Sequence, residues 1–271
     1  MKYQTFLPPP HLAGLVRFFW VLESDQTTAT PYVYRSMADG CIELVFHYKG
    51  RFEEVTPTGT IPQSYALIHG PTQYFSRFVT HEAFGIFGVY LYPFALQQLF
   101  NIPTTSISDQ MVQLDDIIRK EGGEIEEQIL LAKDHQERYR ILALFLSRQA
   151  RKYENSASIP AIKAISYLIQ QGGVSSVKQL AAQSYLSVRQ FERKFKQFAG
   201  FSPKRYTRIV RFQQAMNQYG NHQKTLTQIA YECGYYDQSH FIHDFKAFSG
   251  YHPKTFFTGK AEGIEFRDTP K

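Results

Sequence analysis

Hydrophobic and polar residues alternate with a period of two through the first third of the chain. In the clearest stretch, Ile42, Leu44 and Phe46 alternate with Glu43 and His47. This period is typical of strands, because successive side chains point to opposite faces of a sheet. One face of this strand should therefore be buried in the core, and the other face should be exposed to water or should line a pocket. Aromatic and β-branched residues bounded by turn signals predict further strands at 15–22, 64–68, 73–80 and 84–92. Several strands at such short spacing suggest a small sandwich or barrel.

From Pro93 onward the hydrophobic period lengthens to that of a helix. Apolar residues recur at helical spacing over 94–100, 115–119 and 124–152. The last of these predicts one long amphipathic helix, whose apolar face is suited to packing on the barrel or on a second subunit. Residues 154–158 lack any apolar periodicity and are expected to form a linker. A further helix over 160–171 should begin a second domain.

One segment occurs twice in the second half of the chain. Residues 195–206 read FKQFAGFSPKRY, and residues 245–256 read FKAFSGYHPKTF. In each copy a Gly ends one helix and a Pro begins the next. The chain therefore contains one structural unit twice, and two helical DNA-reading modules are the leading interpretation.

Each copy belongs to a helix-turn-helix pattern. In the first unit, a short helix over 177–184 and a turn at Tyr185 precede a second helix that is capped by Ser187. In the second unit, Gly234 lies in the turn and Asp237 is the cap. Inward positions on the second helices are aromatic: Phe191, Phe195 and Phe198 in one, and Phe241, Phe245 and Phe248 in the other.

The outward face of the first of these second helices is suited to reading bases. Arg can bind guanine with two hydrogen bonds and Gln can do so with adenine, so Arg189, Gln190 and Arg193 are candidates. Glu192 has two interpretations: it accepts a hydrogen bond from cytosine, or it pairs with Lys196 one helical turn away.

The charged residues are unevenly distributed between the two halves of the chain. The net charge of the 271 residues is +6. Residues 156–271 hold 16 Lys+Arg against 7 Asp+Glu, a net of +9, whereas residues 1–155 hold 14 against 17, a net of −3. This asymmetry is typical of a protein in which one domain meets phosphates and the other does not.

The double pattern resembles the AraC/XylS family of bacterial transcription regulators over roughly residues 158–257. The matching positions are Ser187, Phe191, Arg193, Phe195, Lys196, Gly200, Pro203, Tyr206, Arg211 and Ala215, followed by Ile229, Ala230, Gly234, Tyr235, Phe241, Phe245, Lys246, Gly250 and Pro253. In that family, two helix-turn-helix units joined by a long helix, here 203 to about 219, enter adjacent major grooves. The two reading helices should then lie about one DNA turn, roughly 34 Å, apart.

The resemblance implies an α+β fold with two domains. Residues 1–155 would form a small cupin-like β-barrel with following helices, for sensing or dimerisation. Residues 156–258 would form the all-α DNA-binding domain, and residues 259–271 a C-terminal tail.

The resemblance also assigns roles to individual residues. It implies base contacts by Arg189, Gln190, Glu192 and Arg193 in the first unit and by Gln238, Ser239 and His243 in the second. Phosphate contacts are expected from Ser187, Lys204 and Lys254, which give affinity without sequence preference. Arg211 is expected to brace the two units rather than bind DNA. Tyr185 departs from the family, because many members have Gly there and a positive φ is uncommon for other residues.

For the first half of the chain, the resemblance leaves two roles open, namely sensing of a small molecule and dimerisation. Trp20, Tyr34 and His47 are candidates for the wall of an effector pocket. A metal-dependent enzyme is the contrasting class, but no His-x-His pair is present, so we predict no catalytic residue, no metal and no cofactor. Two distant cysteines, together with an N-terminus unlike a signal peptide, predict a cytoplasmic protein.

The partners implied are double-stranded DNA at a promoter or operator, a small-molecule effector, a second copy of the chain and, for an activator, RNA polymerase. No membrane is expected among them, because no apolar run is long enough to cross one.

Overall fold

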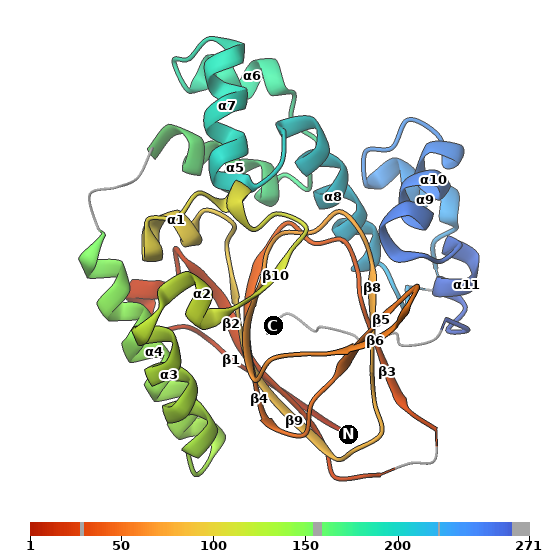
Figure 1. The fold of residues 1–271 in the computed structure, drawn as a ribbon. Coiled ribbons are helices and arrows are strands. Elements are labelled where there is room, and N and C mark those ends of the chain that lie inside the picture. The colour runs from red at the N-terminus through yellow and green to blue at the C-terminus, as the bar shows by residue number, and fades with distance from the viewer. Residues whose placement is uncertain (28–29, 154–158, 222, 262–271) are drawn as a thin grey trace.

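The computed structural model describes residues 1–27, 30–153, 159–221 and 223–261, and shows a β-rich N-terminal region beside an all-helical C-terminal region (Figure 1). The C-terminal helices lie along two sides of the strands, at the top and right of the view (Figure 1). The predicted linker at 154–158 and most of the predicted tail lie outside the described residues. The α+β layout with two regions confirms the predicted fold class.

The strands form two antiparallel sheets. The larger sheet has the order β1-β2-β9-β4-β7-β10, formed by Lys2–Phe6, Val16–Ser24, Phe84–Leu91, Ile42–Lys49, Ala66–His69 and Met111–Gln113. The smaller sheet has the order β3-β8-β5-β6, formed by Tyr32–Ser36, Ser76–Thr80, Glu53–Thr56 and Gly59–Pro62. Their inner faces pack around a cluster that includes Trp20, Phe52 and Phe78.

The sheets do not close into the cupin-like barrel that the resemblance implied. In the described part of the chain, one isolated β-bridge outside the strands joins Asp39 to Thr72. Both residues lie in segments that cross from one sheet to the other, and neither segment continues a ladder. The described strands therefore form two facing sheets.

Helices cover the outer face of the larger sheet. They are the 3-10 helices Pro10–Leu12 and Thr104–Ser106, and α1 Ala95–Phe100, α2 Leu114–Ile118, α3 Lys120–Leu131 and α4 His135–Lys152. The single helix expected over 124–152 is wrong. Asp134 caps a new helix there by accepting a hydrogen bond from the backbone N–H of Glu137 at 2.8 Å, so α3 and α4 form a hairpin.

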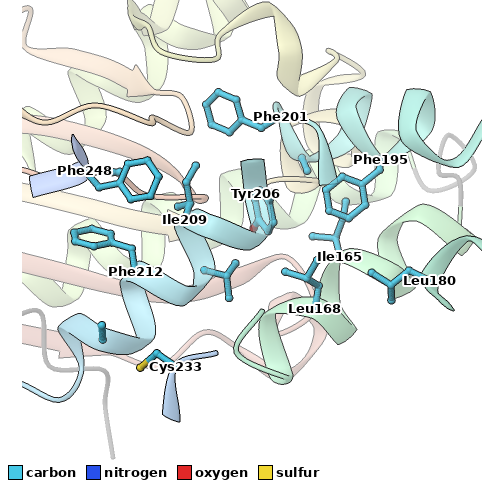
Figure 2. Close-up of a cluster of buried hydrophobic side chains, with 14 of the residues drawn as sticks. Ile165, Leu168, Leu180, Phe195, Phe201, Tyr206, Ile209, Phe212, Cys233 and Phe248 are labelled. Carbon is cyan, nitrogen blue, oxygen red and sulfur yellow. The ribbon is translucent and has the colours of Figure 1, made fainter. Parts of the chain in front are cut away.

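The C-terminal region consists of seven described helices around one aromatic core. They are α5 Ile159–Gln170, α6 Val177–Gln183, α7 Val188–Ala199, α8 Pro203–Met216, α9 Leu226–Glu232, α10 Gln238–Ser249 and α11 Pro253–Phe257. Figure 2 shows Tyr206, Ile209 and Phe212 projecting from α8 between Phe195 of the first unit and Phe248 of the second. The two units therefore share one hydrophobic core through α8 and do not have separate cores.

Candidate functional site

The first helix-turn-helix unit consists of α6, a turn and α7. Ser187 begins α7 with a capping box: its Oγ accepts a hydrogen bond from the backbone N–H of Gln190 at 3.3 Å, and Oε1 of Gln190 accepts one from the backbone N–H of Ser187 at 3.2 Å. Both of these polar side chains are thus engaged in starting the helix. In the turn, Tyr185 adopts a φ of 53° and is 98% exposed, so the positive φ considered for it is confirmed.

The base-contact candidates of this unit share one exposed surface. Arg189, Gln190, Glu192 and Arg193 are all exposed on the first two turns of α7, opposite the buried Phe191. Among the described residues, no ion pair joins Glu192 to Lys196. The Glu192 carboxylate therefore remains available as a hydrogen-bond acceptor at this surface.

The second unit repeats the plan with α9, Gly234 and α10. Asp237 caps α10 by accepting from the backbone N–H of His240 at 2.7 Å. Gln238, Ser239 and His243 are exposed near the start of α10. The phosphate candidates Lys204 and Lys254 are also exposed, each at the second residue of a helix that begins with Pro.

Two arginines on α8 connect the units. The Nε atom of Arg211 donates to the carbonyl oxygen of Gly173 at 2.9 Å, and its guanidinium also lies against Gly234 of the second turn, which agrees with the bracing role expected for it. Arg208, which the sequence did not single out, binds the fully buried Asp244 of α10 through both oxygens; its Nε donates to Oδ2 at 3.1 Å. The second reading helix is thereby held in a fixed orientation to α8.

Both reading helices are attached to the β region by their C-terminal ends. The Oγ atom of Ser108 donates to the carbonyl oxygen of Gly200, the C-cap of α7, at 3.0 Å. At the end of α10, Arg35 donates to the carbonyl oxygen of Ser249 at 3.3 Å and its guanidinium lies over the ring of Tyr251. The C-terminal ends of both helices thus contact the N-terminal region, whereas residues at their N-terminal ends are exposed.

Three further hydrogen bonds join the segment between β3 and β4 to the helices, one of them from the side-chain amide of Gln213 in α8 to the carbonyl oxygen of Ala38. The backbone N–H of Ala38 donates to the carbonyl oxygen of Phe248 at 3.0 Å. The hydroxyl of Tyr206, buried in α8, donates to the carbonyl oxygen of Gly40 at 3.1 Å. This segment is thus a direct structural link from the sheets to the connecting helix α8 and to α10 of the second unit.

A cavity of about 400 Å³ opens between the two sheets. The described residues lining it include Glu43, His69 and Tyr90, which are neighbours on adjacent strands of the larger sheet. Sequence reasoning did not assign these three to a pocket, although Glu43 shares its strand face with His47.

The three predicted pocket residues lie on the same inner faces but are not among the residues that line this cavity. Trp20 and Tyr34 pack in the aromatic cluster between the sheets, and the indole of Trp20 lies over Gly88, where an added Cβ would be 2.4 Å away. His47 is 1% exposed, and burial lowers its pKa to about 4.

In the described residues, no three His, Cys, Asp or Glu side chains gather as a metal site would require. None of the helices described is both long enough and apolar enough to span a membrane.

Two segments match known protein families. Residues 4–113 match a domain of unknown function, DUF6597, and residues 180–259 match a helix-turn-helix domain. The HTH-type transcriptional activators RhaS of Klebsiella pneumoniae (strain 342) and Escherichia coli (strain SE11) are each 32% identical to this chain, over 83 and 81 residues. These matches cover 31% and 30% of this chain and 30% and 29% of the two relatives. The chain thus spans less than a third of the length of the curated relatives that it matches.

Among solved structures, the chain is similar to ToxT from Vibrio cholerae O395, crystallised bound to (E)-4-(8-methylnaphthalen-1-yl)but-3-enoic acid. The TM-score is 0.51 and the identity is 11%, with 96% of this chain and 100% of that chain covered. At this identity the similarity shows a shared fold.

Proposed function

We propose that this chain is a sequence-specific DNA-binding regulator of transcription of the AraC/XylS type, because residues 180–259 match a helix-turn-helix domain and the activator RhaS is 32% identical over 83 residues. The observation that carries the proposal is the arrangement of α7 and α10. Both helices have capped, exposed N-terminal ends, and the C-terminal end of each is hydrogen-bonded to the N-terminal half of the chain. A helix that enters the major groove contacts base edges with its N-terminal residues.

Within the interface, we assign base contacts and phosphate contacts to different residues. Arg189, Gln190, Glu192 and Arg193 on α7, and Gln238, Ser239 and His243 on α10, would face base edges. Lys204, Lys254 and Ser187 would meet phosphates and fix the register of the protein on the duplex. The basic excess of residues 156–271 supports this division, because phosphate neutralisation supplies most non-specific affinity.

The proposal predicts a difference between two substitutions on neighbouring helices. Preferred sites are first selected from random duplexes with the full chain. Arg193→Ala should then weaken the preferred site by about 1–3 kcal/mol and relax base preference at one position. Lys204→Ala should weaken preferred and random duplexes equally and make the salt dependence less steep. Binding is measured by fluorescence anisotropy between about 50 and 200 mM salt.

Two results would contradict this assignment. One is the absence of duplex binding by the wild-type chain at low salt. The other is an equal loss on preferred and random DNA for both variants. Glu127→Ala, an exposed change on α3 remote from α7 and α10, is the control and should leave binding unchanged.

We further propose that a small molecule bound between the sheets controls DNA binding. The cavity and the direct hydrogen bonds from residues 36–41 to the helices support this. A ligand that touched this segment would lie one residue away from atoms that hold α8 and α10.

A further inference from the structure

The turn of each helix-turn-helix unit exposes one tyrosine. Tyr185 in the first turn is 98% exposed and Tyr236 in the second is 87% exposed, more than any other large hydrophobic side chain among the described residues. Within the part of the chain that the structure describes, neither side chain makes a hydrogen bond, an ion pair or a ring contact. Packing inside the protein therefore does not explain an aromatic ring at either place.

Backbone hydrogen bonds show how the two turns correspond. In the first turn, the backbone N–H of Leu186 donates to the carbonyl oxygen of Ala181 at 3.4 Å. In the second, the backbone N–H of Tyr235 donates to the carbonyl oxygen of Ala230 at 3.0 Å. The two donors each lie five residues after their acceptor, and both side chains pack on the shared core, so they are equivalent positions.

The exposed tyrosines occupy different positions in this alignment. Tyr185 comes directly before the aligned residue, where the second unit has Gly234, and both adopt a positive φ, of 53° and 77°. Tyr236 comes directly after the aligned residue, as an extra residue of the second turn before its cap, Asp237. The two units thus present an exposed phenol by different means, and duplication of one unit does not explain both.

Tyr185 also carries a conformational cost. Glycine adopts a positive φ readily, whereas a residue with a Cβ is strained there. The second unit avoids this strain by having Gly234 at the matching position. Strained residues cluster where the protein presents a side chain to a ligand. A strained and fully exposed tyrosine therefore indicates a contact outside the chain.

Both tyrosines lie next to the start of a reading helix. Tyr185 is two residues before the cap Ser187, and Tyr236 is one residue before the cap Asp237. In a helix-turn-helix, the first helix crosses the DNA backbone and the second enters the major groove, so the turn between them lies at the edge of the groove. Tyrosine is among the side chains that bind phosphate oxygens in protein–DNA interfaces.

We propose that Tyr185 and Tyr236 contact the DNA backbone, each hydroxyl donating a hydrogen bond to a phosphate oxygen beside the groove that its reading helix enters. This inference rests on the proposed function and adds two residues to its interface. The contact differs from that of a lysine in one measurable respect. A lysine at a phosphate releases counterions and steepens the salt dependence, whereas a hydroxyl brings no positive charge and leaves the slope unchanged.

The test removes each hydroxyl alone, by Tyr185→Phe and Tyr236→Phe in the full chain, with fluorescence anisotropy as the readout. Each variant should weaken preferred and random duplexes by the same factor, about fivefold. The slope of affinity against salt should stay at its wild-type value. Tyr65→Phe, 45% exposed in the N-terminal region, is the matched control and should change neither quantity. An unchanged affinity refutes the contact for that tyrosine, and a less steep slope refutes the uncharged contact.

Methylphosphonate duplexes identify the acceptor. A methylphosphonate replaces one charged phosphate oxygen with a methyl group. When single substitutions are scanned along the preferred site, one position should abolish the difference between the wild-type chain and Tyr185→Phe, because the partner of the hydroxyl is already absent. A different position should do so for Tyr236→Phe. If the difference persists at every position, the phosphate contact is refuted.

Tyr185→Gly separates this contact from a structural role. The variant relieves the positive φ and removes the ring, so its melting temperature should rise while its affinity for DNA falls at least as far as that of Tyr185→Phe. A merely structural role would move stability and affinity in the same direction. A glycine variant that binds DNA as tightly as the wild-type chain would overturn the proposal.

The wild-type chain distinguishes this inference from the proposed function. If it binds no duplex at low salt, the proposed function is refuted and the tyrosine contacts with it. If it binds duplex DNA and both phenylalanine variants bind equally well, this inference alone is refuted.

Discussion

The ion pair between Arg208 and Asp244 offers a quantitative test of how the second reading helix is held. The side chain of Asp244 is 0% exposed and that of Arg208 is 26% exposed. Removing one partner of a buried pair typically costs about 3–5 kcal/mol, because a charge is left buried without compensation. Since Arg208 lies partly in water, we expect Arg208→Met to lower the free energy of unfolding by about 3 kcal/mol, at the lower end of that range.

The measurement is urea unfolding of the full chain followed by far-ultraviolet circular dichroism, which reports mainly on the helices. Lys204→Met on the same helix is exposed and should change stability by less than about 0.5 kcal/mol. The double variant Arg208→Met with Asp244→Leu removes both charges and should recover most of the loss. A loss below about 1 kcal/mol for Arg208→Met, or a double variant as unstable as the single one, would refute the reasoning.

Two further predictions concern stability. Burial lowers the pKa of His47 from 6.5 to about 4, so the unfolded chain binds a proton over a pH range in which the folded one does not. The contribution of His47 to stability should therefore fall by about 3 kcal/mol as the pH drops from 6.5 to 4. His47→Leu should remove this part of the pH dependence in urea titrations at several pH values, and His81→Leu, at an exposed site, should not. Tyr185→Gly should raise stability by about 0.5 kcal/mol in thermal unfolding, because its φ of 53° suits glycine, whereas Tyr236→Gly, also exposed but not at positive φ, should lower it. Equal losses in the two glycine variants would contradict the role of φ.

Features that depend on near neighbours in the chain were predictable. The caps Ser187 and Asp237 and the C-cap glycines Gly200 and Gly250 are where the pattern placed them. Capping links residues within four positions of each other, so the sequence alone contains the necessary information.

Features that depend on distant partners were not predictable. The strands β1, β3, β5, β6 and β10 are short and mostly half-buried or exposed, so their hydrophobic pattern is weak. The row of Glu43, His69 and Tyr90 requires the register of three strands that are far apart in sequence. For the same reason, nothing local indicated that Gly200 and Ser249 contact the N-terminal region, or that Arg208 binds Asp244.

The capping box at the start of α7 limits what Gln190 can recognise. Its amide oxygen accepts from both the backbone N–H and the hydroxyl of Ser187, at 3.2 and 3.0 Å, so only the amide NH₂ group is left to face a groove. A glutamine that binds adenine in the two-bond manner needs its oxygen for N6 and its nitrogen for N7. With donors alone, Gln190 suits the N7 and O6 acceptors of guanine instead. In the proposed interface, the cap Ser187 would therefore change the base that Gln190, the third residue of α7, prefers from adenine to guanine.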